Sequence, residues 1–333
     1  MFRAGSLQST AVVTAIGSYV PERVLTNADL EAMVDTNDEW IVQRTGISER
    51  RIAAENEYCS DLAIAAVRNL VERYGSDIGD VDYILTATSS PDTVFPSVSA
   101  RMQAAFGIPA CGTADVQAAC AGFVSALQMA NGLLLGGLHR KVLVIGAETL
   151  SKITDYTDRT TCILFGDGAA AFLVEAAADG QGSFNASSVS TQGESGHHLY
   201  RSALAPAIGE FPLQAGGYIV QNGREVYKWA VTNVSEGVKT LLEASGMRAE
   251  ELDWFVPHSA NMRMIESICE RTGIPLERTL HSLTTCGNTS AASIPLAIDA
   301  AVKDGRLKSG DWMLLYGFGG GLTQAGLLLR WTL

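Results

Sequence analysis

A single cysteine, Cys120, stands in a run of alanine and glycine at residues 118–122. A strand-like segment, 112–116, precedes it, and an apolar stretch, 121–135, follows it and ends in two glycines. This pattern predicts a buried helix that begins at Cys120. Free amides and the helix dipole at a helix start favour the thiolate, which is the nucleophilic form of cysteine. The small neighbours leave room for a substrate, although most lone cysteines have a structural role.

Two polar residues, His258 and Asn288, occupy comparable positions later in the chain. His258 follows the apolar segment 252–256, and Asn288 stands before the helical pattern 290–303. A cysteine, a histidine and an asparagine can serve as nucleophile, base and orienting group in a thiol hydrolase. The same set can form carbon–carbon bonds, with an acyl group on cysteine and hydrogen bonds from the other two to a thioester enolate. A simpler interpretation makes Asn288 a helix cap and His258 a buried, backbone-bonded residue.

The elements that must position these residues repeat along the chain. In each half a strand-like segment is followed by a loop, a helix and the same Gly-Ile-Pro turn. The matching segments are 81–85 with 252–256, and 107–109 with 273–275. Cys120 and Asn288 lie 13 and 15 residues beyond the first glycine of their respective turns. Such self-similarity predicts one βαβ-type unit used twice, so a pseudo-twofold axis would bring Cys120, His258 and Asn288 to one cleft.

Apolar periodicity predicts the other elements. We expect strands at 11–17, 81–87, 112–116, 141–147, 159–165, 168–174, 252–256 and 312–317, and helices at 38–46, 60–74, 98–106, 121–135, 222–245 and 290–303. The stretch 176–215, rich in Ala, Gly and Ser, is the least regular and marks the expected boundary. The prediction is an α/β protein with an N-terminal half, 1–180, that carries the cysteine and a C-terminal half, 181–333, that carries the histidine and asparagine.

Composition narrows the class of protein. Of 333 residues, 47% are hydrophobic and 18% charged, which supplies a large core. The net charge of −12 argues against a general nucleic-acid binder, because phosphate binding needs clustered cations. Six cysteines form neither a CxxC pair nor a zinc spacing, so we expect free thiols, no metal and a cytoplasmic location. No apolar run approaches the roughly 20 residues of a membrane span, and we expect no secretory signal.

Three ordered motifs resemble those of a known family. The segments 118–122, 257–263 and 287–290 are similar to the active-site motifs of β-ketoacyl-[acyl carrier protein] synthase III, and the likeness covers nearly the whole chain. Further matches lie at 27–30, 38–42, 44–47, 165–169 and 318–321. The chain looks most similar to the second synthase III of Bacillus-type Firmicutes. The resemblance implies a thiolase-like fold, with two pseudo-symmetric βαβ-repeat halves in α-β-α-β-α layers.

The resemblance also implies a decarboxylative Claisen condensation that initiates type II fatty-acid synthesis. A short acyl-CoA would acylate Cys120, and malonyl-[acyl carrier protein] would then lose CO2 while His258 and Asn288 stabilise the enolate. The amides of Cys120 and Gly320 would form the oxyanion hole, and the product would be 3-oxoacyl-[acyl carrier protein]. Acyl-CoA is then a substrate, and no cofactor is expected. The alternatives are a specialised synthase or acyltransferase of secondary metabolism, and a non-catalytic homologue, against which the presence of Cys120 speaks.

Binding residues follow from the same resemblance. The CoA-binding set would be Trp40, Arg44, Thr45, Arg159, Gly223 and Asn261. The acyl pocket would consist of Phe95, Phe165 and Leu150, with Phe95 reaching the partner subunit of a homodimer. The acyl carrier protein would meet Arg263, Ser259 and Ala260. From spacing alone, Trp40 and Arg44 share a helix face and form either a structural stack or a platform for a nucleotide.

Two positions depart from the family pattern. Ser259 replaces the usual glutamine of Pro-His-Gln-Ala-Asn, and Cys286 stands where tyrosine usually precedes the Gly-Asn pair. We interpret Cys286 as a buried packing residue. Both departures leave the primer open among acetyl, propionyl and branched acyl groups, and the Firmicute-like motifs favour branched primers.

Overall fold

Two five-stranded sheets form the framework of the protein, for which a computed structural model describes residues 2–333. The first sheet has the order β2 (Ala11–Tyr19), β8 (Asp167–Ala176), β7 (Lys141–Thr149), β5 (Tyr83–Ala87) and β6 (Gly112–Val116). The second has the order β1 (Arg3–Ser6), β9 (Phe184–Thr191), β16 (Thr323–Arg330), β15 (Trp312–Gly319) and β14 (Trp254–Pro257).

The two sheets share one pattern of strand directions. In the first sheet β6, β5 and β7 are parallel, and β8 and β2 continue the sheet in antiparallel pairings. In the second, β14 and β15 are parallel, and β16 and β9 continue it in the same way. In the second sheet, Phe255 of β14 forms a parallel bridge with Thr279. This bridge corresponds to the parallel pairing of β5 with β6 in the first sheet. The repeat predicted from spacing is therefore present in the sheets, with β1 as an additional edge strand.

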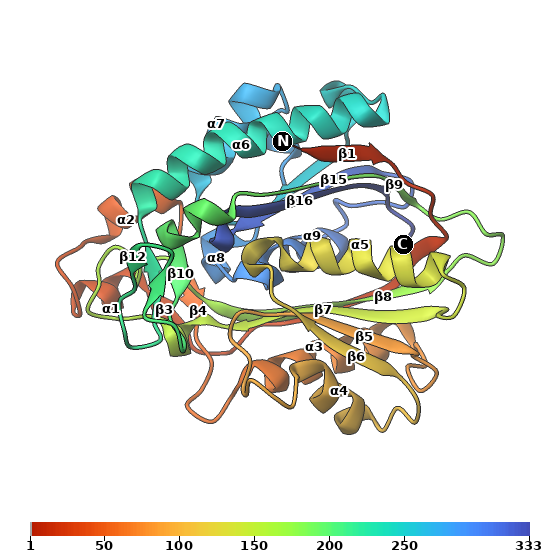
Figure 1. Ribbon diagram of the computed structural model, residues 1–333, viewed down its shortest axis with the longest axis horizontal. Coiled ribbons are helices and arrows are strands. Elements are labelled where there is room, and N and C mark those ends of the chain that lie inside the picture. The colour runs from red at the N-terminus through yellow and green to blue at the C-terminus, as the bar shows by residue number, and fades with distance from the viewer. Residues whose placement is uncertain (1) are drawn as a thin grey trace.

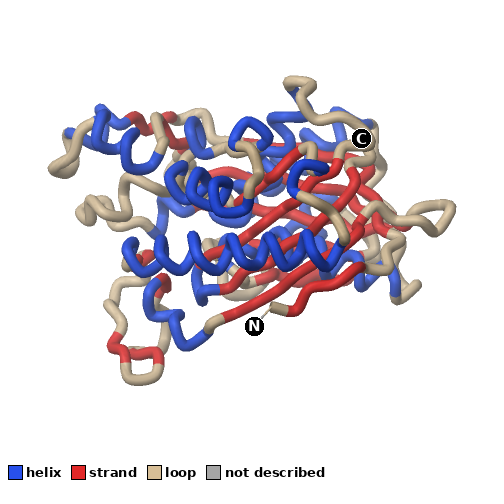
Figure 2. The backbone as a smooth tube through the Cα atoms, turned by 90° about the horizontal axis from the view of Figure 1, so that it is seen from above, coloured by secondary structure: helices blue, strands red, loops and turns tan. Residues whose placement is uncertain are grey.

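Helices fill the space between the sheets and cover both outer faces (Figure 1). The middle layer is α5 (Gly122–Leu135) and α9 (Ser293–Lys303). The first sheet is covered by α3 (Cys59–Tyr74) and α4 (Val98–Phe106), and the second by α6 (Gly223–Ser245) and α7 (Met262–Thr272). Figure 2 shows the long helix of this upper layer lying across the strands. The layers alternate α-β-α-β-α, which confirms the thiolase-like α/β fold.

The shorter elements gather at one end of the molecule, at the left of Figure 1. They are α1 (Asn27–Glu31), α2 (Asp38–Thr45), α8 (Leu283–Cys286), β3 (Val24–Thr26), β4 (Glu49–Arg51), β10 (Leu199–Arg201), β11 (Ala207–Ile208), β12 (Phe211–Pro212) and β13 (Ile219–Gln221). Within residues 2–333, no helix has the length and apolar character needed to cross a membrane.

The two kinds of helix differ in how much of their surface is apolar. α5 faces a sheet on both sides, and its Phe123 ring meets the Phe172 ring of β8 edge-on, with 5.0 Å between centroids. Burial of one such side chain contributes about 2–3 kcal/mol. α6 covers an outer face and buries one side only, and its ends are set by the Asn222 cap and by Gly246 in a left-handed conformation. The packing of α5 from both sides fixes the position of its first turn, which follows directly on Cys120.

One predicted strand, 159–165, is wrong. These residues form turns, because the Asp158 carboxylate accepts hydrogen bonds from the Thr160 amide and the Thr161 hydroxyl and so bends the backbone. Only Phe165 makes an isolated strand bridge. Strong β propensity in this segment is therefore overridden by local side-chain bonds.

The stretch 176–215 is less irregular than predicted, because residues 184–191 form β9. This strand contains four serine or threonine residues and one asparagine, so its sequence carries little of the apolar signal that the other strands have. The other predicted strands and helices are confirmed, with their ends shifted by a few residues.

Candidate active site

A cavity of about 1250 Å3 is lined by residues from both halves of the chain. Cys120 reaches it from the start of α5, His258 from the end of β14, and Asn288 from the loop before α9. Gly320, which follows β15, lines the same cavity. The structure thus brings together the three polar residues that spacing placed in one cleft, together with the glycine expected to hold an oxyanion.

Cys120 lies in a 3₁₀ turn, Ala119–Ala121, that leads into α5. The preceding Ala119 has φ 45°, a left-handed conformation that is strained for alanine and typical of functional sites. Gly319 packs directly against the thiol, since a Cβ added to it would lie 2.9 Å from Cys120 Sγ. The cysteine is only 8% exposed, and its open side faces the cavity.

Burial controls the ionisation of this cysteine. It raises the pKa of the Cys120 thiol to about 12, although a hydrogen bond with Ser290 opposes the shift. The expectation that the helix start makes the thiolate the favoured form is therefore wrong, because desolvation of the charge outweighs it. The resting side chain is a thiol at neutral pH, so its proton must go to an acceptor when the sulfur forms a bond.

His258 is buried after β14, lines the same cavity as Cys120 and is uncharged. Its exposed fraction is 2%, and burial lowers its pKa to about 3. The ring meets Phe318 edge-on, with 5.4 Å between centroids, and Nδ1 lies 2.8 Å from Ser293 Oγ. Ser293 Oγ also accepts a bond from the Ser259 amide at 3.3 Å. Because that oxygen already accepts one bond, its own proton is best placed to bond Nδ1, which leaves the ring proton on Nε2.

Replacing Ser293 with alanine tests this assignment. The variant loses the donor to Nδ1, so the Nε2–H tautomer of His258 loses its advantage and CO2 release from a malonyl thioester should fall about 10-fold or more. Acylation of Cys120 should stay within about 2-fold of the wild-type rate, because the tautomer of His258 affects stabilisation of the enolate and not the attack of the sulfur. Nitrogen-15 NMR of the imidazole reads the tautomer directly. Unchanged ring-nitrogen shifts in Ser293→Ala would contradict the role of Ser293.

Asn288 is held by backbone on both sides. Its amide donates to the Leu164 carbonyl at 2.8 Å, its carbonyl accepts from Gly166 at 3.0 Å, and its side-chain Oδ1 accepts from the Ser290 amide at 2.9 Å. Since the side-chain oxygen is engaged, the Nδ2 hydrogens are what this carboxamide offers to a ligand. The close approach requires glycine: a Cβ added to Gly166 would lie 2.1 Å from the Cys286 carbonyl.

The two helix starts are related, but not at the residues that spacing paired. Ala119 before α5 and Ser290 before α9 both have left-handed φ values, 45° and 47°, and each opens a 3₁₀ turn. By this geometry the counterpart of Cys120 is Ala291, and Asn288 lies two residues before the strained position. The duplication therefore provides two equivalent turns. The first presents Cys120 from within the turn, and the second is preceded by the loop that presents Asn288.

Four of the other predicted binding residues line the cavity: Leu150, Phe165, Ala260 and Asn261. Gly223 lies in an adjoining pocket of about 650 Å3, which shares Tyr200 and Gln221 with the main cavity. The structure thus extends the cavity toward the start of α6.

A tryptophan–arginine stack lies on α2. Arg44 and Arg159 have their guanidinium carbons 5.6 Å and 4.9 Å from the centre of the Trp40 ring. Asn261 ties this helix to the cavity, since its Nδ2 donates to the Arg44 carbonyl at 2.9 Å. Thr45 is buried, and its hydroxyl donates to the Ile41 carbonyl at 2.7 Å, so the structure does not bring this residue to the cavity.

Three other predicted binding residues, Phe95, Arg263 and Ser259, lie in environments that differ from one another. Phe95 is 84% exposed, and Arg263 is exposed at the start of α7. Ser259 is fully buried, and its hydroxyl accepts a bond from the Ser282 amide at 3.0 Å, which places it inside the fold instead of on a docking surface. Cys286, expected to be buried, is partly exposed.

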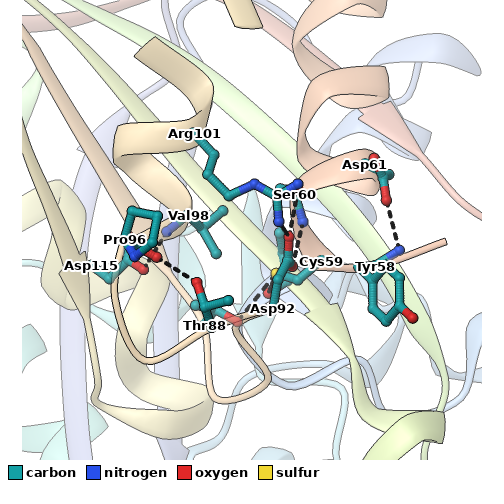
Figure 3. A network of polar contacts seen from close by, with 12 residues as sticks. Tyr58, Cys59, Ser60, Asp61, Thr88, Asp92, Pro96, Val98, Arg101 and Asp115 are labelled. Atoms are coloured by element: carbon teal, nitrogen blue, oxygen red, sulfur yellow. Dashed lines mark hydrogen bonds and ion pairs between the residues drawn. The ribbon is translucent and has the colours of Figure 1, made fainter. Parts of the chain in front are cut away.

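The loop that carries Phe95 forms one wall of the cavity and is anchored at its base (Figure 3). Asp92 accepts bonds from the Ser60 amide at 3.0 Å and the Ser60 hydroxyl at 2.6 Å, and it forms an ion pair with Arg101. Asp115 accepts from the Val98 amide at 2.8 Å. These bonds fix the loop to α3 and α4 and leave Phe95 projecting outward.

Sequence reasoning missed three residues of the site: Glu148, Ser290 and Ser293. Ser293 is five positions after Asn288 and is the first residue of α9, and this spacing was a usable signal. Glu148 is the polar end of an apolar strand, where ligands often gather in α/β sheets. Within the described part of the chain, no group of three or more His, Cys, Asp or Glu side chains could hold a metal ion.

Fold and site together define a thiolase-like enzyme of the condensing type: duplicated sheets enclose a helix that starts at a cysteine, and a histidine and an asparagine face that cysteine's cavity. Two family profiles match, 3-oxoacyl-[acyl-carrier-protein (ACP)] synthase III at residues 114–193 and its C-terminal domain at residues 242–331.

Known proteins agree with this class. A β-ketoacyl-[acyl-carrier-protein] synthase III 2 of Halalkalibacterium halodurans is 59% identical over 97% of both chains. The protein of that name in Bacillus subtilis is 56% identical over 97% of this chain and 99% of its own. A crystal structure of the synthase III from Thermus thermophilus superposes with a TM-score of 0.91 at 45% identity, covering 96% of this chain and 99% of that one. The chain belongs to the β-ketoacyl-[acyl carrier protein] synthase III family.

Proposed function

We propose that this protein condenses a short-chain acyl-CoA primer with malonyl-[acyl carrier protein] and releases CoA, CO2 and 3-oxoacyl-[acyl carrier protein], the initiating step of type II fatty-acid synthesis. One observation supports it above the others: Cys120, His258, Asn288 and Gly320 line a single cavity. Family membership over nearly the full chain favours the same reaction. The reaction proceeds through an acyl-enzyme and needs no cofactor, since acyl-CoA is a substrate.

In the first half-reaction, Cys120 Sγ attacks the acyl-CoA thioester. The negative charge on the tetrahedral oxygen rests on the backbone amides of Cys120 and Gly320, and a donor of this kind is worth about 3–4 kcal/mol. The strained turn at Ala119 supports this role, because it holds the Cys120 amide and thiol on the cavity side of the helix start. CoA leaves, and the acyl group stays on the sulfur.

In the second half-reaction, the malonyl thioester carbonyl accepts hydrogen bonds from His258 Nε2 and Asn288 Nδ2. Both groups are neutral donors whose other atoms are already bonded, to Ser293 and Ser290 respectively. They stabilise the enolate as CO2 departs, and its carbon attacks the acyl-cysteine. A buried neutral imidazole suits this task, since it donates a bond and does not protonate the carbanion.

Trp40, Arg44 and Arg159 are proposed to receive the nucleotide end of CoA. The Trp40→Ala variant should raise the KM for acyl-CoA about 10-fold, because a base that stacks on an aromatic ring gains about 1–3 kcal/mol. The rate with an acyl-N-acetylcysteamine thioester, which has no nucleotide, should be unchanged. Steady-state kinetics with both substrates checks this prediction. An equal loss with both would show that Trp40 supports the fold of α2 instead of binding CoA.

The remaining assignments are proposals of the same kind. Phe165, Leu150 and Asn261 border the acyl and pantetheine parts of the cavity, with Gly223 in the adjoining pocket. The exposed Arg263 suits contact with an acidic carrier protein. Ser259 is buried and cannot make that contact, so of the pair Ser259 and Ala260 only Ala260 is accessible to the carrier protein. The halves 1–180 and 181–333 are proposed as the two thiolase-like units. The free cysteines suit a cytoplasmic location.

A homodimer is proposed from the exposed apolar surface around the anchored loop. Phe95 and Val94 are 84% and 91% exposed, and β6 beside them is an edge strand of the first sheet. Exposed apolar side chains next to an unpaired strand edge are typical of subunit contacts. In the dimer, Phe95 would close the acyl pocket of the other subunit.

Reconstitution tests the reaction as a whole. The purified protein is supplied with acetyl-, propionyl- or isobutyryl-CoA and malonyl-[acyl carrier protein], and mass spectrometry follows the carrier protein. We expect 3-oxoacyl-[acyl carrier protein] together with CO2 and free CoA in equal amounts. Release of free acid without CO2 would indicate a thiol hydrolase and overturn the proposal.

A further inference from the structure

Glu148, at the end of β7, is a fully buried carboxylate behind the catalytic cavity that the two half-reactions above do not use. None of the ion pairs among residues 2–333 involves it, so no cation compensates its charge. Burial of an unpaired carboxylate is costly, and such groups are retained where hydrogen bonds or chemistry require them.

Hydrogen-bond donors surround this carboxylate instead of cations. The Ser89 amide donates to both oxygens at 3.0 Å and 3.1 Å, and the Ser90 hydroxyl donates at 2.5 Å. The Thr88 hydroxyl lies at 3.3 Å, and the Ser290 hydroxyl and the Ala291 amide complete the shell. Every one of these groups donates, so the shell is built for the anion, the form that can accept a proton.

Ser290 connects this carboxylate to the cysteine. The 3₁₀ turn that Ser290 opens packs against the turn of Cys120 and against β7, and the Ser290 side chain acts on the ionisation of both the thiol and the carboxylate. Ser290 is itself only 4% exposed. Its left-handed φ of 47° is held by its amide, which donates to Asn288 Oδ1 at 2.9 Å. Strain of this kind persists where a side chain must point in a fixed direction. Ser290 is therefore placed between the sulfur and a buried anion, with a hydroxyl that can relay a proton from one to the other.

His258 cannot fill the same role. Its Nδ1 is engaged by Ser293, its Nε2 carries the one ring proton, and burial lowers its pKa to about 3, so it does not accept a second proton at neutral pH. Burial instead raises the pKa of Glu148 above its usual value, which makes it a stronger base than an exposed carboxylate. Ser290 lies between Glu148 and the thiol, so this carboxylate is placed to take the proton of Cys120 through the serine hydroxyl.

We propose that Glu148, acting through the Ser290 hydroxyl, accepts the thiol proton of Cys120 when the cysteine attacks an acyl-CoA. The S–H bond breaks and its proton passes to Ser290 Oγ, while the Ser290 hydroxyl proton passes to the carboxylate. The electron pair left on sulfur forms the bond to the acyl carbon, and the bond between that carbon and the CoA sulfur breaks. The departing CoA thiolate takes a proton back along the same path. Glu148 is thus a positioning residue for the proposed condensation.

The experiment measures the rate of Cys120 alkylation by iodoacetamide against pH in wild-type, Glu148→Gln and Ser290→Gly proteins. Loss of the acceptor should slow alkylation at neutral pH about 100-fold and confine reactivity to alkaline pH. A bystander anion predicts the opposite sign, because removing a negative charge near a thiol lowers its pKa and speeds alkylation. Ser290→Gly keeps the left-handed backbone and removes the hydroxyl together with its Cβ, so it serves where Glu148→Gln does not fold.

Asp167→Asn is the matched control. Asp167 is another fully buried carboxylate held by amide and hydroxyl donors, from Ala53 and Ser151, and it has no bond to Cys120. It should share any loss of stability but keep the wild-type alkylation profile. Unchanged or faster alkylation in both Glu148→Gln and Ser290→Gly overturns the proton path and leaves the condensation intact. Normal acylation after Cys120 itself is blocked would instead overturn the proposed function.

Discussion

The Cys120→Ala protein is expected to form no covalent adduct with acyl-CoA, and condensation should fall by at least about 10⁴-fold. Cys120 and Gly320, the two proposed oxyanion donors, both line the cavity, and the residues next to the cysteine in sequence are alanines. Intact-mass spectrometry after incubation with acetyl-CoA measures the adduct directly. An adduct of full occupancy on Cys120→Ala would remove this residue from the mechanism.

The chain offers a matched control for this variant. Cys286 is also a free cysteine and is partly exposed, but it does not line the cavity, so Cys286→Ala should be acylated as the wild type is. Decarboxylation of malonyl-[acyl carrier protein] should persist in Cys120→Ala, because His258 and Asn288 remain in place. This retained half-reaction would show that the variant is folded and that the nucleophile and the decarboxylating pair act separately.

The sequence predicts the architecture of this protein well because the signals are strong and repeated. Apolar residues with a period of 3.6 mark the helices, and continuous apolar runs mark the buried strands. The two Gly-Ile-Pro turns mark the duplication. The repeat is least complete at the bridge from Phe255 to Thr279, where a single residue pair takes the place of the strand pairing that β6 makes in the first sheet. Where polar side chains form the strand, as in β9, or local carboxylates bend it, as at Asp158, propensity fails.

The site is predictable in part for a similar reason. Cys120, His258 and Asn288 all stand at ends of elements, where a sequence shows them against apolar neighbours. Their ionisation is not predictable, because it depends on burial that only the packed halves create: the helix start favours a thiolate, yet the packed site holds a thiol. The sequence does not indicate Glu148 and Ser290, because neither stands in a pattern of its own. Their proposed role depends on the contact between two segments that are far apart in the chain.

The His258→Ala and Asn288→Ala proteins are expected to accept an acyl group normally but to release CO2 about 10²–10³-fold more slowly, since each removes one donor to the enolate. Acylation read by intact mass and CO2 release from labelled malonyl-[acyl carrier protein] separate the two steps. His281→Ala is the matched control, because His281 is partly buried but does not line the cavity, and it should release CO2 as the wild type does.

The pH dependence of this release distinguishes a neutral imidazole from a charged one. Burial lowers the pKa of His258 from 6.5 to about 3, so the ring is already neutral at every pH well above that value. If the neutral ring is the donor, its titration adds no step to the rate of CO2 release between about pH 5 and 8. A rate that rises toward acid with a midpoint near 6.5, and that loses this rise in His258→Ala, would make the imidazolium the donor. That outcome would require water to reach the ring, because only solvation could keep its pKa at the ordinary value.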